Sequence, residues 1–305
     1  MKLSSINTGY FKLDGGAMFG VVPKSLWNKL NPADENNLCS WALRCLLIED
    51  GDRKILVDTG IGEKQDEKFF SHYYLHGDDS LETSLAAHHL TRDDITDVIL
   101  THLHFDHCGG AIIRQDGRLI PAFKNATYWS NEAHWQWATQ PNDREKASFL
   151  KENILPIRES GQLKFLPALP AHGAGQPDPD KQDSESSHLQ HHKQTIPFSN
   201  NIQMLIAEGH TRSMMLPMIK HQNNTIVFMA DLLPSAAHIP LPYVMAYDMF
   251  PLTTLSEKKS FLDEAVANSY TLFFEHDPQT VCCRVGRDEK GRYSVIPVDW
   301  NTIGD

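Results

Sequence analysis

The sequence has no apolar run long enough to cross a membrane and no disulfide framework. No stretch of about 18 apolar residues occurs anywhere, so we expect no transmembrane helix and no membrane partner. The residues that follow Lys2 are not an apolar run either, and we expect no signal peptide. The five cysteines are odd in number and irregularly spaced, unlike those of secreted domains that depend on disulfides. These absences together predict a cytoplasmic protein.

Positive charge is scarce. Lys and Arg total 28 against 39 Asp and Glu, which gives a net charge of −11. An acidic surface repels phosphate backbones, so nucleic acid is not an expected partner and RNA processing is disfavoured, although the total charge leaves room for a local basic groove. Hydrophobic residues make up 41% of the 305 residues. That share is enough to bury a sizeable core and predicts a globular protein.

Short apolar runs alternate with turn signals and with helical periodicity. Residues 41–60 predict a β-hairpin around a Gly-Asp turn. Helices are expected over 79–90 and over 256–268, the second capped by Ser256. Strands in two groups with helices between them predict an α/β sandwich with the helices outside.

Two segments in the middle of the chain differ from this pattern. Residues 131–160 have a helical composition, which we expect to be interrupted at Pro141 and again near Pro156. Residues 172–195 are polar and rich in Pro, Asp and Ser, so we expect a surface loop or insertion there. We find no internal repeat and no clear linker, and a single domain over residues 1–305 is expected.

The segment THLHFDHCGG concentrates possible metal ligands at the end of an apolar strand. His102, His104, Asp106 and His107 fall within six positions, and imidazole and carboxylate are ligands that zinc, iron and manganese accept. On an extended chain His102, His104 and Asp106 would share a side, and a turn would direct His107 toward a second ion. The two glycines that follow allow a tight turn. A His-rich surface turn is the alternative, but such a cluster is costly to pack without a partner.

This string resembles the HxHxDH signature of the metallo-β-lactamase superfamily in every ligand position. Four more blocks resemble that family and follow in its order: LVDTG at 56–60, EGHT at 208–211, FMAD at 228–231 and FEHD at 274–277. The resemblance covers roughly residues 40–280. It implies an αββα sandwich of two mixed β-sheets with helices on the outer faces.

The resemblance also implies a role for each ligand. A first ion would be held by His102, His104 and His210, a second by Asp106, His107 and His276, with Asp231 bridging the two. Zinc is the expected metal, and the same ligands accept manganese, iron or cobalt. Two such ions about 3.5–4 Å apart hold a bridging water and lower its pKa toward neutrality. The resulting hydroxide is the expected nucleophile, and Asp106 and Asp231 are the predicted catalytic residues.

Other candidate residues have an ordinary structural alternative. Asp58 is expected to orient a ligand histidine by a hydrogen bond, although Asp-Thr-Gly is also simply a good turn. Cys108 is expected to be a small buried residue rather than a nucleophile. The resemblance places the N-terminal segment near the substrate, so Met18, Phe19 and Trp27 are candidates for an apolar pocket wall, with core packing as the alternative.

The spacing of the last three candidate ligands indicates a subgroup of this superfamily. Asp231 follows His210 by 21 residues and precedes His276 by 45, which is similar to acyl-homoserine lactonases and the related methyl parathion hydrolases. Many of those lactonases carry a Tyr three residues after the bridging Asp, where it helps bind the substrate carbonyl. Here that position is Pro234. His238 is a candidate for supplying the missing polar group.

We therefore expect a dinuclear metal-dependent hydrolase that opens a lactone or ester of a small-molecule substrate. N-acyl-homoserine lactone is the leading candidate, which would imply quorum quenching. A phosphotriesterase or arylesterase using the same hydroxide is the main alternative. β-Lactamase activity is disfavoured by Asp231, because those enzymes usually have another residue there, and a di-iron oxidoreductase would normally carry a flavodoxin domain. A non-catalytic binding module is disfavoured by the presence of every ligand. The sequence leaves the oligomeric state open, and a homodimer sharing the apolar N-terminal segment is one alternative.

Overall fold

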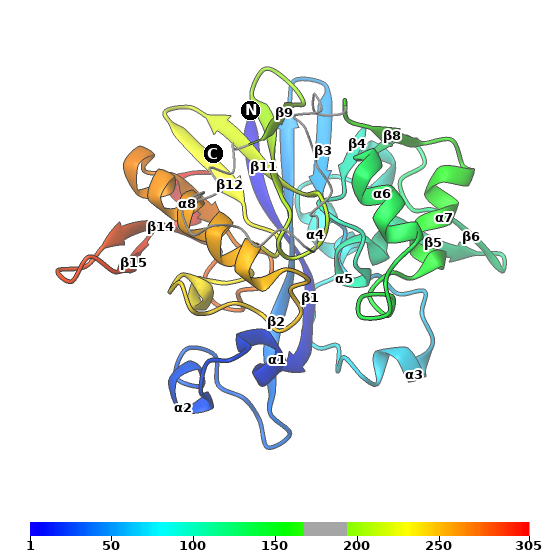
Figure 1. Cartoon of the computed structure of the whole chain (residues 1–305). Coiled ribbons are helices and arrows are strands. Elements are labelled where there is room, and N and C mark those ends of the chain that lie inside the picture. Colours follow the sequence, from blue (N-terminus) through cyan, green and yellow to red (C-terminus); the bar gives the residue numbers. More distant parts are fainter. Residues whose placement is uncertain (168–193, 305) are drawn as a thin grey trace, which may run out of the picture.

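The computed structural model describes residues 1–167 and 194–304. Two β-sheets lie face to face, and helices cover their outer surfaces (Figure 1). The α/β sandwich that the sequence predicts is therefore confirmed. The polar loop expected over 172–195 lies outside the described residues, except for its last two positions.

The first sheet is mixed. The strands β1, β2 and β3 pair antiparallel, and β4, β7 and β8 then continue parallel to β3. In spatial order the sheet consists of β1 (Lys2–Asp14), β2 (Leu38–Asp50), β3 (Arg53–Val57), β4 (Asp97–Ile99), β7 (Thr127–Ser130) and β8 (Leu163–Phe165). The predicted hairpin of residues 41–60 corresponds to β2 and β3 and is confirmed.

The second sheet is also mixed, because its pair β12–β13 is parallel while every other pair is antiparallel. In spatial order it consists of β15 (Tyr293–Pro297), β14 (Cys282–Arg287), β13 (Thr271–Phe273), β12 (Asn224–Phe228), β11 (Met214–His221), β10 (Ile202–Ala207) and β9 (Thr195–Pro197). A separate hairpin is formed by β5 (Ile112–Gln115) and β6 (Arg118–Pro121).

Strand β2 shows why the sequence folds into layers. Side chains alternate along a strand, so neighbours face opposite sides of the sheet. Leu46 and Ile48 pack into the core between the two sheets. Cys45 and Leu47 pack into a second core on the outer side. Both faces of this sheet are thus buried, which explains why the segment is almost continuously apolar.

The longer helices supply the outer layers. Those packed on the first sheet contribute Leu85, Trp135 and Ile157 to its outer core. The helix on the second sheet contributes Phe261 and Leu262 to the cluster that extends through that sheet to Leu46 and Ile48. The helices that carry Trp135 and Ile157 lie on one side of the molecule, and the helix that carries Phe261 lies on the other (Figure 1). The first group is α4 (Leu81–Ala87), α6 (Glu132–Thr139) and α7 (Lys151–Glu159), and the second is α8 (Pro251–Asn268). The short helices are α1 (Gly15–Phe19), α2 (Lys24–Trp27), α3 (Glu67–Phe70) and α5 (Phe105–Cys108).

Two predicted details of the helices are wrong. Helix α8 begins at Pro251 rather than after Ser256, because the fixed φ of proline suits the first helical turn. Helix α7 continues through Pro156, where a break was expected. Pro156 is buried beside Ile154 and Ile157, and their packing outweighs the one backbone hydrogen bond that proline removes.

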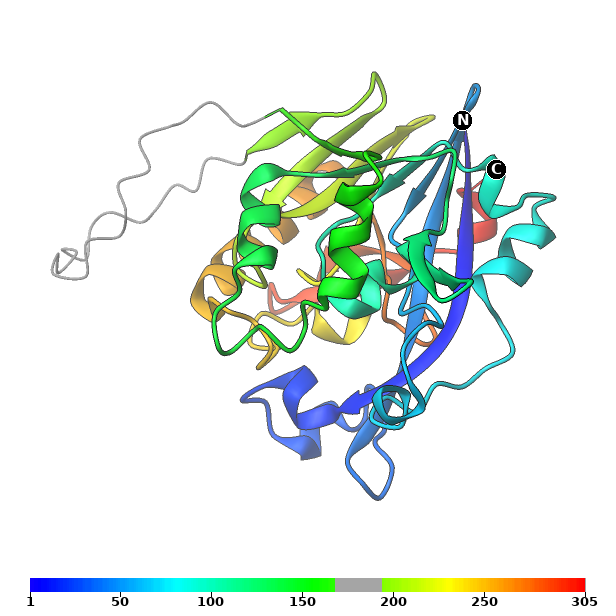
Figure 2. The ribbon, with the colours of Figure 1, turned by 90° about the vertical axis from the view of Figure 1, so that its right-hand side faces the viewer.

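The ends of the described chain meet at one end of the sandwich. The Leu3 amide donates to the carbonyl oxygen of Gly304 at 2.8 Å, and both ends lie together in Figures 1 and 2. Within the described ranges, we find no helix with the length and apolarity that a membrane crossing requires.

A buried lysine attaches α8 to the loop at residues 240–243. The Lys258 side chain is fully buried, and its ammonium group donates to the carbonyl oxygens of Pro240 at 2.8 Å, Leu241 at 3.3 Å and Tyr243 at 2.9 Å. Burial lowers the pKa of Lys258 to about 7. The ammonium form therefore predominates in slightly acidic solution.

We predict that Lys258→Met lowers the free energy of unfolding by about 1–3 kcal/mol, because buried carbonyl oxygens lose their donor. Urea denaturation at about pH 6, where the ammonium is charged, measures the change. Lys259→Met is the matched control, since Lys259 is exposed and forms only a surface ion pair with Asp263, worth at most about 1 kcal/mol. Equal stabilities of the two variants would contradict the prediction.

Candidate metal centre

The predicted ligands follow the carboxyl ends of strands. Neighbouring strands β3 and β4 are parallel, and so are β12 and β13. The two carboxyl ends of each pair therefore lie at the same edge of the sheet. The segments that follow β4, β10, β12 and β13 carry His102, His210, Asp231 and His276, respectively. All of these side chains are buried. Residues far apart in the sequence thus meet at one end of the sandwich.

The local conformation of the His-rich segment differs from the extended chain that was expected. Strand β4 ends at Ile99, and helix α5 begins at Phe105. Asp106 therefore lies on a helical turn together with His107, rather than on a shared side with His102 and His104.

The side chains form two adjacent groups. Within each group, the ligand atoms lie within 4.8 Å of one another. The first group is His102, His104, His210 and Asp231, and the second is Asp106, His107 and His276. Asp231 lies between them. Its Oδ2 is 3.1 Å from His210 Nε2, and its Oδ1 is 3.3 Å from His276 Nε2. This division matches the two ion sites that the resemblance implies.

The donor atoms fit divalent ions. His104 Nδ1 lies 3.1 Å from His102 Nε2 and 3.2 Å from His210 Nε2, and the Nε2 atoms of His107 and His276 are 3.2 Å apart. Ligands about 2.0–2.1 Å from a tetrahedral zinc ion are separated by roughly 3.4 Å. Buried Asp231 Oδ1 has no well-aligned hydrogen bond among the described residues, although His276 Nε2 lies 3.3 Å away. A divalent ion would supply the partner that this oxygen lacks.

The other ring nitrogen of most of these histidines is held from outside. His104 Nε2 lies 2.9 Å from Glu145 Oε1, and His210 Nδ1 lies 2.9 Å from Asp248 Oδ1. His276 Nδ1 donates to the carbonyl oxygen of Ala42 at 2.8 Å. An outer acceptor fixes the proton on that nitrogen and leaves the lone pair of the inner nitrogen free for a metal.

Sequence reasoning missed Glu145 and Asp248. They lie 41 and 38 residues from the histidines that they hold. Neither belongs to a recognisable motif, and only the folded chain brings them to the ligands. Arg144 connects their two loops, because its guanidinium group donates to the carbonyl oxygen of Ala246.

Asp58 lies behind the second group. Its Oδ2 is 3.1 Å from His107 Nδ1, and its carboxylate also accepts from the amide and hydroxyl groups of Thr101 at 2.8 and 2.6 Å. Asp58 has a φ of +56°, which is costly for a non-glycine residue and is often found at functional sites. The geometry is that of the expected orienting role.

Gly109 and Gly110 are needed for close packing rather than for an unusual turn. A Cβ atom on Gly109 would lie 2.0 Å from the carbonyl oxygen of Ile61, and one on Gly110 would lie 2.2 Å from that of Thr59. The loop that carries Asp58 therefore packs directly against the segment that follows α5, with no space for a side chain between them.

The electrostatics of the cluster favour cations. Burial and the neighbouring imidazoles hold the pKa of His102 well below its usual range. Burial opposes the protonation of His210 as well, but Asp231 and Asp248 raise its pKa to about 10. The pKa values of His107 and His276 are also raised by nearby carboxylates, against the effect of burial. Without metal, His210 therefore retains its proton at neutral pH, and the protonated forms of His107 and His276 are favoured as well.

A pocket of about 370 Å³ opens onto the centre. Its walls are mainly apolar and include Met18, Phe105 and Met245, together with the rings of Tyr73 and Tyr247. Of the residues predicted to form the wall, only Met18 lines it.

Phe19 and Trp27 belong to the buried core behind this wall. Their rings stack with centroids 5.1 Å apart, and both are almost fully buried. His238 lies there too, because its ring stacks on Phe19 at 4.8 Å. Its Nε2 donates to the carbonyl oxygen of Met18 at 2.9 Å, and its Nδ1 lies 2.8 Å from Ser235 Oγ. Both nitrogens are occupied, so His238 does not offer a polar group to the pocket.

Cys108 is fully buried, and burial raises its pKa to about 12. Its thiol donates to the carbonyl oxygen of Leu103 at 3.3 Å. A neutral, inaccessible thiol is not a nucleophile. These observations agree with the small buried residue that was expected.

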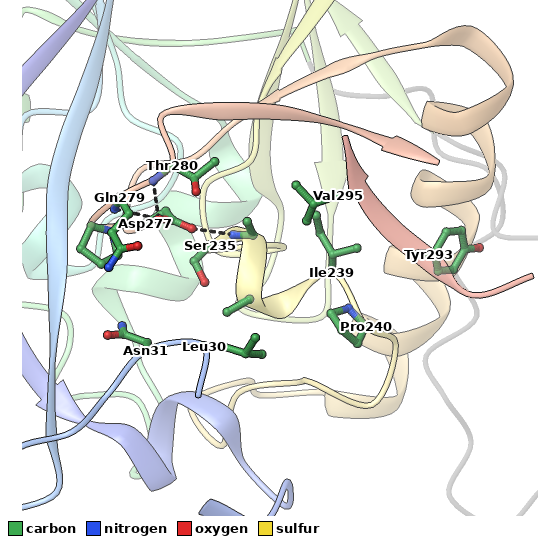
Figure 3. A pocket seen from close by; sticks show the side chains of 13 residues that line it. Leu30, Asn31, Ser235, Ile239, Pro240, Asp277, Gln279, Thr280, Tyr293 and Val295 are labelled. Carbon is green, nitrogen blue, oxygen red and sulfur yellow. Dashed lines mark hydrogen bonds between the residues drawn. The ribbon is translucent and has the colours of Figure 1, made fainter. Parts of the chain in front are cut away.

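A second cavity of about 330 Å³ lies beside the loop that follows His276 (Figure 3). None of the predicted ligands lines it. In its wall, the Asp277 carboxylate accepts from the amides of Ala236, Gln279 and Thr280 at 2.9, 2.9 and 2.6 Å. These bonds hold the chain immediately after His276 and thereby help to fix that ligand.

We predict that divalent metal binding releases protons. Nearby carboxylates raise the pKa values of His107, His210 and His276, that of His210 to about 10. Protonated imidazoles are thus favoured in the metal-free protein, and an ion must displace their protons. Apparent affinity for Zn²⁺ should therefore rise between about pH 6 and about pH 9. Calorimetric titrations in buffers of different ionisation enthalpy count the released protons. An affinity that is independent of pH, with no proton release, would show that the pKa assignments are wrong.

Comparison with known proteins agrees with this geometry. Residues 44–176 match the model of the metallo-beta-lactamase superfamily. An N-acyl homoserine lactonase of Bacillus cereus is 31% identical over 142 residues, which cover 43% of this chain and 50% of that protein. The chain thus spans about half the length of the curated lactonases that it matches.

Solved structures resemble the whole chain. A probable metal-dependent hydrolase from Staphylococcus aureus superposes with a TM-score of 0.80 at 27% identity, covering 97% of this chain and 96% of that one. AidC, described as a dizinc quorum-quenching lactonase, superposes with a TM-score of 0.74 at 19% identity over 98% and 94% of the two chains, a likeness of fold alone. The match over residues 44–176, the fold and the clustered candidate ligands agree, and this chain has the metallo-beta-lactamase fold.

Proposed function

We propose that this protein is a metal-dependent hydrolase that opens a lactone ring, with N-acyl-homoserine lactones as the leading substrates and quorum quenching as the resulting role. The observation that carries the proposal is the pair of ligand groups joined by Asp231 at the base of a largely apolar pocket. When bound, two divalent ions would supply an activated water and polarise the carbonyl group under attack. Similarity to the Bacillus lactonases supports the choice of substrate.

Two tyrosines of the pocket replace the group that Pro234 cannot provide. The hydroxyl groups of Tyr73 and Tyr247 have no hydrogen-bond partner within the described part of the chain, and both residues line the pocket. Burial and the charge of Asp106 raise the pKa of Tyr73 to about 12, and burial also raises the pKa of Tyr247. Both phenols therefore stay protonated and can donate to a substrate carbonyl.

The apolar walls suit an acyl chain. Met18, Met245 and Met249 lie on the pocket beside Leu13 and Phe105. Methionine side chains adapt to ligands of different shape. Burial of each CH₂ group contributes about 0.8 kcal/mol, so longer acyl chains should bind more tightly until the pocket is full.

The function is tested by loading the purified protein with Zn²⁺ and measuring hydrolysis of homoserine lactones of increasing acyl length, aryl esters and paraoxon-type phosphotriesters. We expect kcat/KM to be highest for the lactones and to rise with chain length. Asp106→Ala should lose more than about 100-fold of this activity, whereas exposed Asp52→Ala should lose none. Turnover of only the phosphotriesters would replace the lactonase proposal with the phosphotriesterase alternative, and no turnover of any substrate would refute both.

We predict that Tyr73→Phe and Tyr247→Phe each lower kcat/KM for lactones by about 3- to 10-fold, the worth of one hydrogen bond. Exposed Tyr74→Phe is the matched control and should match the wild type. Steady-state kinetics on one lactone measure all three variants. Unchanged kinetics in both pocket variants would exclude the phenols as substrate donors.

A further inference from the structure

Glu275 and His276 are consecutive residues that contact opposite edges of the same imidazole ring. Glu275 Oε2 lies 2.9 Å from His107 Nδ1, and His276 Nε2 lies 3.2 Å from His107 Nε2. Both side chains are buried, and Glu275 is fully so. The segment after β13 thus provides one predicted ligand of the second group and holds the outer nitrogen of another.

Two carboxylates compete for one nitrogen. His107 Nδ1 carries at most one proton, yet Asp58 Oδ2 and Glu275 Oε2 lie 3.1 and 2.9 Å from it. Asp58 has other donors, because it also accepts from the amide and hydroxyl groups of Thr101. Neither oxygen of Glu275 has a well-aligned hydrogen bond to any described residue. His107 is therefore the group on which the Glu275 carboxylate depends.

No other cationic group among the described residues forms an ion pair with this carboxylate. The charges of His276 and Arg44 also act on it, but the Nη1 of Arg44 donates to the carbonyl oxygen of Phe274 at 2.7 Å. In the residues that the structure describes, His107 is the ion-pair partner of Glu275. A buried carboxylate without a compensating charge is costly. A divalent ion on the inner nitrogen of His107 would make the imidazole a stronger donor and supply positive charge.

We propose that Glu275 is a positioning residue for the second metal, which it serves by holding His107 with Nε2 directed at the ion and by offsetting the charge of that ion. The inference rests on the two-metal centre of the proposed function. It assigns to Glu275 the outer-acceptor role that Glu145 and Asp248 have for His104 and His210.

The test is a metal titration in the absence of substrate. Metal-free wild type, Glu275→Gln and Glu145→Gln are titrated with Co²⁺, and visible absorbance and calorimetry resolve the two equivalents. Gln keeps the shape of Glu but removes its charge. Glu275→Gln should weaken binding of the equivalent at the second group by about 10- to 100-fold and leave the other unchanged. Glu145→Gln should do the reverse, because it holds His104 of the first group.

A purely structural role would change both equivalents together and lower the melting temperature of the metal-free protein. Glu275→Asp keeps the charge and is expected to recover most of the lost affinity, and it serves as the second variant if Glu275→Gln does not fold. Two equivalents bound as in the wild type, or an equal loss of both, would overturn the proposal. Wild-type protein that binds fewer than two ions would instead refute the two-metal centre itself.

Discussion

The centre depends on imidazole rings that are held at both nitrogens in a buried place. Each outer nitrogen needs an acceptor, because a loose ring would point its lone pair in many directions and weaken any metal site. Glu145, Asp248 and Ala42 supply these acceptors for His104, His210 and His276. Two of the three are buried carboxylates, so negative charge gathers around the histidines. Divalent ions would complete the arrangement.

The sandwich makes this possible by its strand directions. Parallel pairs in each sheet place several carboxyl ends at one edge, and the segments that follow them are short. A short segment after a fixed strand leaves its side chain little freedom, which keeps the loss of conformational entropy on metal binding small. Two residues beside the candidate ligands have positive φ angles: Asp58, which contacts His107, and Ala230, which precedes Asp231 in the sequence. These angles show that the backbone is bent to reach these positions.

The same loops connect the centre to the pocket. Arg144 joins the loop of Glu145 to that of Asp248, and both loops also contribute residues to the pocket wall. A change in the wall is therefore coupled to the orientation of the first group of ligands. The buried Lys258 fixes the start of the second loop from the side of α8. The same contacts therefore position the ligands and shape the pocket.

The sequence by itself determined those features of the protein that depend on local motifs and periodicity. His102, His104, Asp106 and His107 stand together, and blocks around His210, Asp231 and His276 follow in order, so the clustering of these candidate ligands and the sandwich could be predicted. Periodicity also located β2, β3 and α4, although it misplaced the start of α8, where packing and Pro251 decide.

Apart from Asp58, only the tertiary structure decided which residues support the ligands. Glu145 and Asp248 belong to no motif, and the FEHD block did not single out Glu275, since any acidic residue brought to the right place can accept from an imidazole. The same reason explains why His238, close in sequence to Asp231, lies in the core beside Phe19, while Tyr73 and Tyr247 reach the pocket. Contact between distant segments depends on how the layers pack, and that is a property of the folded chain rather than of any local pattern.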